Sequence, residues 1–302
     1  LGLPRETYSS FADGVSNIIS SGQHNRIQFN NLSVLTGSEM DDPAYLKKYG
    51  IVTVNNKLVN IHGSLTDDFE IDEHQRLVIA TGAMPKKDWV KARMFGWMTA
   101  LLHFDKLIQI PLILINSKSG VPYRKLIESF LDNEENHPIL TEIIDFFRTQ
   151  AECIQNGGTE FVQSKKWLNI WWPPDELMLI KLCAENKLSE FYKEAEQLIG
   201  KFLDRKKINN CKDILYDAIV FNQNLLKMPF QDKNLKIKLS YNIWDIYKAN
   251  LTGNNVPVEK GEYYYKIDRT SSKWLSWEDW CREVVWYGNK RGAYLYSCRE
   301  IN

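Results

Sequence analysis

The stretch that decides the fold is LGLPRET at residues 1–7, followed by RIQFNNLSVL at 26–35 and TGSEM at 36–40. The run 27–35 is apolar enough to predict a strand packed inside an α/β layer. A helical pattern lies between the two ends of this stretch. We therefore expect the chain to open on a strand–helix–strand crossover, with most of the first strand missing.

The predicted helix has clear start and stop residues. Gly2 and Pro4 mark a corner between a strand and a helix. Glu6 and Thr7 supply the acidic group and the capping hydroxyl that a helix start favours, and Gly22 is expected to end the helix. Four apolar side chains recur at helical spacing and are expected on one face: Phe11, Val15, Ile18 and Ile19.

These residues also resemble a known family. GLPRETYSSF at 2–11 and FNNLSVLTGSEM at 29–40 are similar to the end of the barrel of radical S-adenosylmethionine (radical SAM) enzymes. There, GLPGET follows a late strand and LLPGTEL or LLPGTEM follows the next. The resemblance is best to the branch that often carries a cobalamin-binding domain. Arg5 replaces the usual glycine, which makes a left-handed turn there less expected, and Thr36 replaces the usual proline.

The resemblance implies an enzyme of which this chain is a C-terminal fragment. The intact parent would bind S-adenosylmethionine and a 4Fe-4S cluster, cleave the former reductively and act by radical chemistry, with methyl transfer through cobalamin as one form. The Cys-x3-Cys-x2-Cys loop that holds the cluster would precede Leu1. We therefore expect this chain alone to have no catalytic or metal-binding residue, to bind no cofactor stably and to be inactive.

The resemblance also implies a set of cofactor-binding residues near the barrel mouth, on the adenine side of S-adenosylmethionine. They are Gly2, Glu6, Asn31, Leu32 and Ser33. The expected partners are the missing N-terminal part of the same protein and a small-molecule or peptide substrate. For Asn30 and Asn31, ordinary hydrogen bonding at a strand end remains the alternative interpretation.

Composition bounds these expectations. The 302 residues include 38 basic and 38 acidic side chains, so no bulk attraction to nucleic acid or to a membrane is expected. The five cysteines have no metal-ligand spacing, and an odd count favours free thiols in a reducing compartment, the cytoplasm. These cysteines are Cys153, Cys183, Cys211, Cys281 and Cys298. Cys183 and Cys211 lie in or beside apolar helical patterns and are expected to be buried.

The predicted fold class is an α/β remnant of a partial (β/α) barrel followed by a mainly α-helical C-terminal domain with a few short strands (α+β). Residues 1–40 would be the end of the barrel, 41–84 a connecting hairpin with loops, and 85–302 the helical domain. The hairpin is predicted from segments 51–54 and 57–61 around Asn55-Asn56, with His62-Gly63 at its end. The acidic run 67–73 is interpreted as a solvated loop, because calcium-loop spacing is not matched.

Further elements follow from apolar periodicity and from turn residues. Helices are expected over 44–49, 85–110, 123–131, from 138, from 174 towards 202, over 214–228 and over 277–287. Pro111 is expected to bend or end the long helix 85–110. His103 in that helix is interpreted as a hydrogen-bonded core or boundary histidine. Segments 235–241 and 263–267 are predicted to form paired strands.

A rival hypothesis comes from another class of protein. The chain contains no phosphate-binding loop, His-Glu-x2-His or Gly-x-Ser-x-Gly motif, and no Asp-x-His-x2-Gly motif for cobalamin ligation. It could then be a non-catalytic helical binding or scaffold module whose first forty residues match by chance. A Cys-x3-Cys-x2-Cys loop upstream of Leu1 in the gene would favour the enzyme, and its absence would favour the module.

Overall fold

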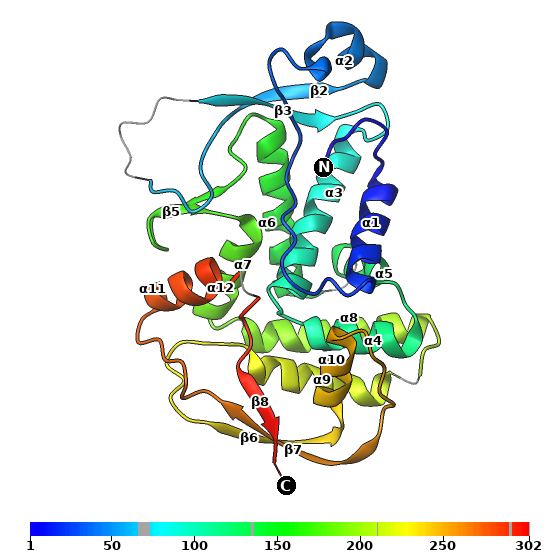
Figure 1. The fold of residues 1–302 in the computed structure, drawn as a ribbon, viewed down its shortest axis with the longest axis vertical. Coiled ribbons are helices and arrows are strands. Elements are labelled where there is room, and N and C mark those ends of the chain that lie inside the picture. The colour runs from blue at the N-terminus through cyan, green and yellow to red at the C-terminus, as the bar shows by residue number, and fades with distance from the viewer. Residues whose placement is uncertain (66–72, 134–135, 210, 290–291, 302) are drawn as a thin grey trace.

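A computed structural model describes residues 1–65, 73–133, 136–209, 211–289 and 292–301. Helices fill the middle of the molecule, between a small sheet at one end and a second small sheet at the other (Figure 1). This confirms the expected mixture of helix and sheet. Every named strand pair in the described residues is antiparallel, so these pairs do not include the expected barrel strands.

The helices and strands have the following bounds. The helices are α1 (Tyr8–Ser20), α2 (Pro43–Tyr49), α3 (Lys86–Thr99), α4 (Gln109–Ser119), α5 (Tyr123–Leu131), α6 (Pro138–Gln155), α7 (Pro174–Ala184), α8 (Leu188–Arg205), α9 (Lys212–Leu225), α10 (Ile243–Leu251), α11 (Trp277–Trp280) and α12 (Tyr287–Asn289). The strands are β1 (Ser33–Val34), β2 (Val52–Lys57), β3 (His74–Ala80), β4 (Val162–Ser164), β5 (Ile170–Trp172), β6 (Leu235–Tyr241), β7 (Lys260–Asp268) and β8 (Ser297–Glu300). They form sheets with the strand orders β1-β3-β2, β4-β5 and β6-β7-β8.

Helix α1 begins and ends as its sequence predicts. The Thr7 hydroxyl accepts a hydrogen bond from the Ser10 backbone N–H at 3.1 Å, and the Ser10 hydroxyl accepts one from Thr7 N–H, which completes a capping box. Gly22 follows the helix with φ +98°. The predicted apolar face is wrong at Ile18, whose side chain is 48% exposed, because the buried face is rotated towards Tyr8 and Ala12.

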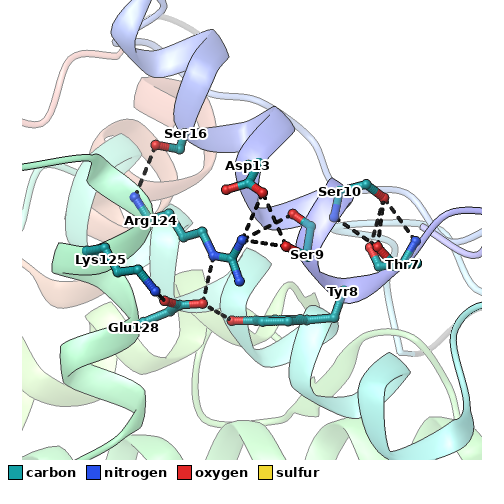
Figure 2. A network of polar contacts seen from close by, with 9 residues as sticks. All are labelled: Thr7, Tyr8, Ser9, Ser10, Asp13, Ser16, Arg124, Lys125 and Glu128. Carbon is teal, nitrogen blue, oxygen red and sulfur yellow. Dashed lines mark hydrogen bonds and ion pairs between the residues drawn. The ribbon is translucent and has the colours of Figure 1, made fainter.

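A polar network fixes α1 against α5 (Figure 2). Arg124 of α5 pairs with Asp13 at 2.8 Å and donates to the Ser9 hydroxyl at 2.7 Å. Glu128, one turn further along α5, accepts from Arg124 Nε at 2.8 Å and from the Tyr8 hydroxyl at 2.9 Å. Because one guanidinium joins both helices, the position of α1 is set by α5 as well as by the core.

The opening segment differs from the expected strands. Only Ser33–Val34 of the run 27–35 is a strand, because residues 27–32 run along α3 as an irregular segment that packs Phe29 against Gly96. Leu1 N–H donates to the Asn30 carbonyl, and Leu32 N–H donates to the Leu1 carbonyl, as two parallel neighbours would do.

The turn before α1 corrects a second expectation. Arg5 has φ +69°, so it adopts the left-handed conformation in spite of its side chain. Hydrogen bonds from Glu6 N–H to the Leu3 carbonyl at 3.1 Å and from Gly2 N–H to Glu6 Oε2 at 2.9 Å hold this turn. The local bonds therefore outweigh the strain at a position where the family has glycine.

The predicted hairpin at 51–61 is wrong. Asn55 and Asn56 lie inside β2, which pairs along its length with β3. Asn56 is fully buried and donates to the carbonyls of Ile154 (3.1 Å) and Gly158. The partner of β2 thus comes from a later segment, not from 57–61. The acidic run falls mainly on 66–72, outside the described residues.

The predicted helix 85–110 is also divided. Helix α3 passes into a π-helical turn, Ala100–Phe104, and the chain then bends by 96° before α4. The break precedes Pro111, which lies in the first turn of α4 where proline is tolerated, so the expected role of Pro111 is wrong. No single helix of the described residues is long and apolar enough to cross a membrane; the two segments Lys86–Phe104 and Gln109–Ser119 pass that test only together, as a bent pair.

Several C-terminal expectations are confirmed. Strands β6 and β7 pair antiparallel, and Ser276 caps α11 by accepting from the Asp279 N–H at 3.0 Å. Beyond α11 the predicted helix becomes π-helical over Cys281–Trp286. Cys183 and Cys211 are buried as expected.

Candidate functional site

A cavity of about 280 Å³ lies between the segment 26–31, helix α3 and the start of α7. Its wall mixes aromatic, amide and charged side chains, as small-molecule sites commonly do. The lining residues are Arg26, Ile27, Gln28, Phe29, Asn30, Asn31, Ile61, Gln75, Arg93, Trp97, Ala100, Glu160, Phe161, Pro173, Pro174 and Asp175. We take this cavity as the candidate functional site.

Helix α3 supplies one wall through residues one turn apart. The Arg93 guanidinium lies over the Trp97 ring at 4.5 Å from its centroid, and Nη1 donates to the Phe29 carbonyl. Both side chains are nearly fully buried. Burial lowers the pKa of Arg93, and Glu160 partly opposes that effect.

The opposite wall centres on Glu160. Asn31 Nδ2 donates to Glu160 Oε1 at 2.5 Å, and Gln75 Nε2 donates to Glu160 Oε2 at 2.7 Å. The Ser33 hydroxyl donates in turn to Gln75 Oε1 at 2.6 Å. The Asn31 amide oxygen has no hydrogen-bond partner among the described residues. It is therefore an acceptor available to a ligand at the cavity wall.

Behind the cavity, Arg26 joins three buried acids. Its guanidinium lies 2.9 Å from Asp105 Oδ1, 2.5 Å from Asp175 Oδ2 and 3.5 Å from Glu176 Oε1. Burial alone would lower the pKa of Arg26, but these carboxylates raise it. Burial raises the pKa of Asp105 well above its usual range, against the attraction of Arg26. Arg26 is therefore a structural counterion that also reaches the cavity.

His62 extends this buried cluster. Its Nε2 lies 2.7 Å from Glu176 Oε2, and its ring packs against the rings of Trp172 and Trp286. The residue has φ +58° and is buried. The interpretation of His62-Gly63 as a hairpin end is therefore wrong, because His62 is a buried partner of a carboxylate from α7.

The five predicted cofactor-binding residues do not all meet at the cavity. Asn31 lines it, and Ser33 reaches its wall through Gln75. Leu32 contributes backbone bonds to Leu1 and Val78. Gly2 and Glu6 are joined to each other in the turn before α1 and are not lining residues. The structure therefore brings Asn31 and Ser33 together and leaves Gly2 and Glu6 apart from the cavity wall.

Sequence reasoning missed Arg26, Arg93 and Glu160. Arg93 had one usable signal, because it is a charged residue directly before the apolar run that begins at Met94, in a helix expected to be buried on most sides. Glu160 follows a glycine-containing loop and has no local signal. Its role depends on Asn31, 129 residues earlier in the chain.

The cofactors implied by the resemblance fit the described residues unequally. No group of three or more His, Cys, Asp or Glu side chains in this part of the chain could hold a metal ion, so a 4Fe-4S cluster does not fit. The cavity is below the range of roughly 300–1,000 Å³ of sites that bury drug-sized ligands, so a corrinoid does not fit within it. Its aromatic and amide walls, with one unsatisfied acceptor, do fit part of a nucleoside-like or similar polar molecule.

Comparisons with known proteins identify relatives of the chain. No protein-family model matches it. It is 29% identical over 139 residues to the cobalamin-dependent radical SAM methyltransferase TokK of Streptomyces tokunonensis, a match that covers 46% of this chain and 20% of that enzyme. It is 31% identical over 102 residues to the 2-(S-pantetheinyl)-carbapenam-3-carboxylate methyltransferase of Streptantibioticus cattleyicolor, covering 33% of this chain and 14% of that enzyme. The chain is therefore similar to cobalamin-dependent radical SAM methyltransferases, which confirms the resemblance found in its first forty residues.

Proposed function

We propose that this chain is the C-terminal part of a cobalamin-dependent radical SAM methyltransferase and closes one side of the site where S-adenosylmethionine and substrate meet. The observation that carries the proposal is the match to the Streptomyces tokunonensis enzyme over 46% of the chain. The cluster, S-adenosylmethionine and cobalamin would supply the radical and methyl-transfer chemistry in the whole protein. This chain's own residues would bind and orient the ligands and exclude water.

The opening segment supports this placement. Leu1 and the segment 30–32 exchange hydrogen bonds in the parallel manner, with α1 between them in the chain. Neighbouring strands of a (β/α) barrel have this relation, and sites in such barrels form at the carboxyl ends of the strands. Asn31 lies within this segment and Ser33 follows it directly; Asn31 lines the cavity and Ser33 reaches its wall through Gln75, so we assign both to ligand binding.

We further propose that residues 1–40 are the end of the barrel, 41–84 a connection and 85–302 a domain that covers the barrel mouth. The N-terminal part of the same protein and a small-molecule or peptide substrate would be the partners. None of the five cysteines, all of which are described, forms a disulfide in the structure, which favours a reducing compartment, and we propose the cytoplasm.

The test is performed on the full-length protein, purified and reconstituted with iron and sulfide without oxygen. With a reductant, cobalamin and S-adenosylmethionine, we expect formation of 5′-deoxyadenosine, measured by liquid chromatography. The control is the full-length protein with alanine in place of the cysteines of its Cys-x3-Cys-x2-Cys loop. Failure to form 5′-deoxyadenosine, or absence of such a loop, would overturn the proposal in favour of a non-catalytic helical module.

A further inference from the structure

Arg93 is a buried cation without a carboxylate partner. Its side chain belongs to a residue that is only 6% exposed, yet no ion pair of the described residues includes it. Its Nη1 donates to the Phe29 carbonyl, its face lies over Trp97, and its Nε has no hydrogen-bond partner in the described part of the chain. Arg26, in contrast, contacts three carboxylates.

A buried guanidinium that forms no ion pair is unfavourable, because burial removes the water that would otherwise solvate its charge. The depressed pKa of Arg93 has this cause. The same guanidinium lines the cavity, where its planar donors could bind a carboxylate through two parallel hydrogen bonds. An anion that entered the cavity would thus meet a guanidinium that forms no ion pair with the described residues and that Glu160 and Asp175 influence only from a longer distance.

We propose that Arg93 binds a carboxylate of the ligand that occupies the cavity, while the Asn31 amide oxygen accepts a hydrogen bond from the same molecule. The inference rests on the proposed function and adds the chemical class of the ligand: a small organic monocarboxylate with a hydrogen-bond donor. Glu160 and Asp175 also line the cavity, and their charge disfavours a phosphate dianion there.

Two molecules could supply this carboxylate, S-adenosylmethionine through its methionyl end or the methyl acceptor. The first source is tested with two nucleosides, one with and one without a carboxylate. Binding of S-adenosylhomocysteine, which has the carboxylate, is compared with binding of 5′-methylthioadenosine, which lacks it, by calorimetry on the full-length protein without cluster reconstitution. If the first source is correct, Arg93→Gln weakens the former about tenfold or more and leaves the latter unchanged.

The second source is tested with benzoate and L-proline, each against its amide, by thermal shift on the same protein. If the methyl acceptor supplies the carboxylate, at least one of these acids stabilises the wild type more than its amide does. Arg93→Gln abolishes that difference without affecting S-adenosylhomocysteine. Arg93→Lys keeps the positive charge but loses the two parallel N–H donors of the guanidinium. It should therefore retain part of the preference for the acid over its neutral analogue. Asn31→Ala should weaken the binding of S-adenosylhomocysteine or of L-proline, which carry a hydrogen-bond donor, but not that of benzoate, which carries none.

The matched control is Lys91→Gln, because Lys91 is an exposed cation of the same helix that lies over the Tyr8 ring. Each comparison of acid with neutral analogue is made within one variant, so a general loss of stability does not mimic the result. The proposal is overturned if Arg93→Gln, like Lys91→Gln, shows the same difference between each acid and its neutral analogue as the wild type. It is also overturned if the wild type shows no such difference in binding or stabilisation. If the wild type binds no nucleoside, the first source is excluded and the acid–amide pairs still decide the role of Arg93, while the proposed function is judged separately by the formation of 5′-deoxyadenosine.

Discussion

At the scale of single residues, Arg26 has the largest predicted effect on stability. Removing it by Arg26→Gln leaves Asp105 and Asp175 buried without their cation and takes away one of the partners of Glu176, which should lower the free energy of unfolding by about 3–5 kcal/mol. Arg148→Gln is the control, because its pair with Asp145 is about half exposed and should contribute less than about 1 kcal/mol. Urea unfolding at pH 7 measures both values.

The loss of stability in Arg26→Gln should depend on pH in a defined direction. The pKa of Asp105 is already raised by burial, and it would rise further without the guanidinium. The loss should therefore shrink as the pH falls through the folded pKa of Asp105 in the variant and then in the wild type, because a protonated Asp105 no longer needs the cation. A loss of stability that grows as the pH falls would contradict the buried-acid interpretation.

His24 gives a separate pH dependence. Burial, with a smaller effect of Lys106, lowers the pKa of His24 from 6.5 to about 4. Between these values the unfolded chain binds the proton and the folded chain does not, so stability falls as pH drops from 6.5 to 4 and levels off below. His24→Gln should reduce this slope, although His103, whose pKa burial also lowers, retains part of it.

The control for His24→Gln is His74→Gln at the exposed first residue of β3, which should leave the slope of stability against pH as it is in the wild type. The measurement is chemical unfolding at several pH values. Equal slopes in the wild type and His24→Gln would show that His24 takes up its proton in the folded protein as readily as in the unfolded chain.

At the scale of elements, two helical glycines should respond in opposite ways to alanine. Nothing lies within 4 Å of a Cβ built on Gly200 in α8, so Gly200→Ala should stabilise the fold by about 0.5–1 kcal/mol. A Cβ on Gly96 in α3 would meet the Phe29 ring at 3.3 Å. Gly96→Ala should therefore give no gain or a loss, and melting temperatures will compare the two variants. An equal gain in stability for Gly96→Ala would show that the segment 27–31 moves away from α3 at little energetic cost.

Elements with local sequence signals were predictable. Helix α5 over 123–131 and strand β6 over 235–241 match the expected bounds residue for residue. The break before α4 was not predictable, because residues 105–108 contain neither glycine nor proline and α3 passes into a π turn under tertiary packing. The Asn55-Asn56 pair fits a turn equally well by local chemistry, and only its distant partner β3 makes it a strand.

At the scale of the whole molecule, the 302-residue chain should bind no iron–sulfur cluster. A 4Fe-4S cluster needs several thiolates at one site, and no group of three metal-ligand side chains occurs among the described residues. Reconstitution with iron and sulfide, followed by absorption spectroscopy, should show no cluster band, whereas the full-length protein should show one. A band in the isolated chain would contradict the assignment of the cluster to another segment.

The candidate site was only partly predictable from sequence. Asn31 and Ser33 were predicted from the resemblance to the family motif, although Arg5 and Thr36 depart from that motif. Glu160 and Arg93 could not be predicted, because their roles arise only when the segment 26–31 packs against α3 and the loop after α6. Sequence motifs and hydrophobic periodicity predict local elements. They do not predict which distant segments meet, and the cavity wall is formed by such distant segments.

The buried amide of Asn56 has a mechanical consequence. The Asn56 side chain in β2 donates a hydrogen bond to the carbonyl of Gly158, two residues before Glu160. Gln75 in the adjoining strand β3 donates a hydrogen bond to the Glu160 carboxylate. A ligand that restricts the motion of Glu160 and Asn31 should therefore also reduce the motion of β2, although none of the residues that line the cavity belongs to β2. We expect the backbone amides of β2 to take up deuterium more slowly when ligand is added, which would show that the cavity is occupied. Unchanged uptake with saturating ligand would show that binding in the cavity does not affect β2.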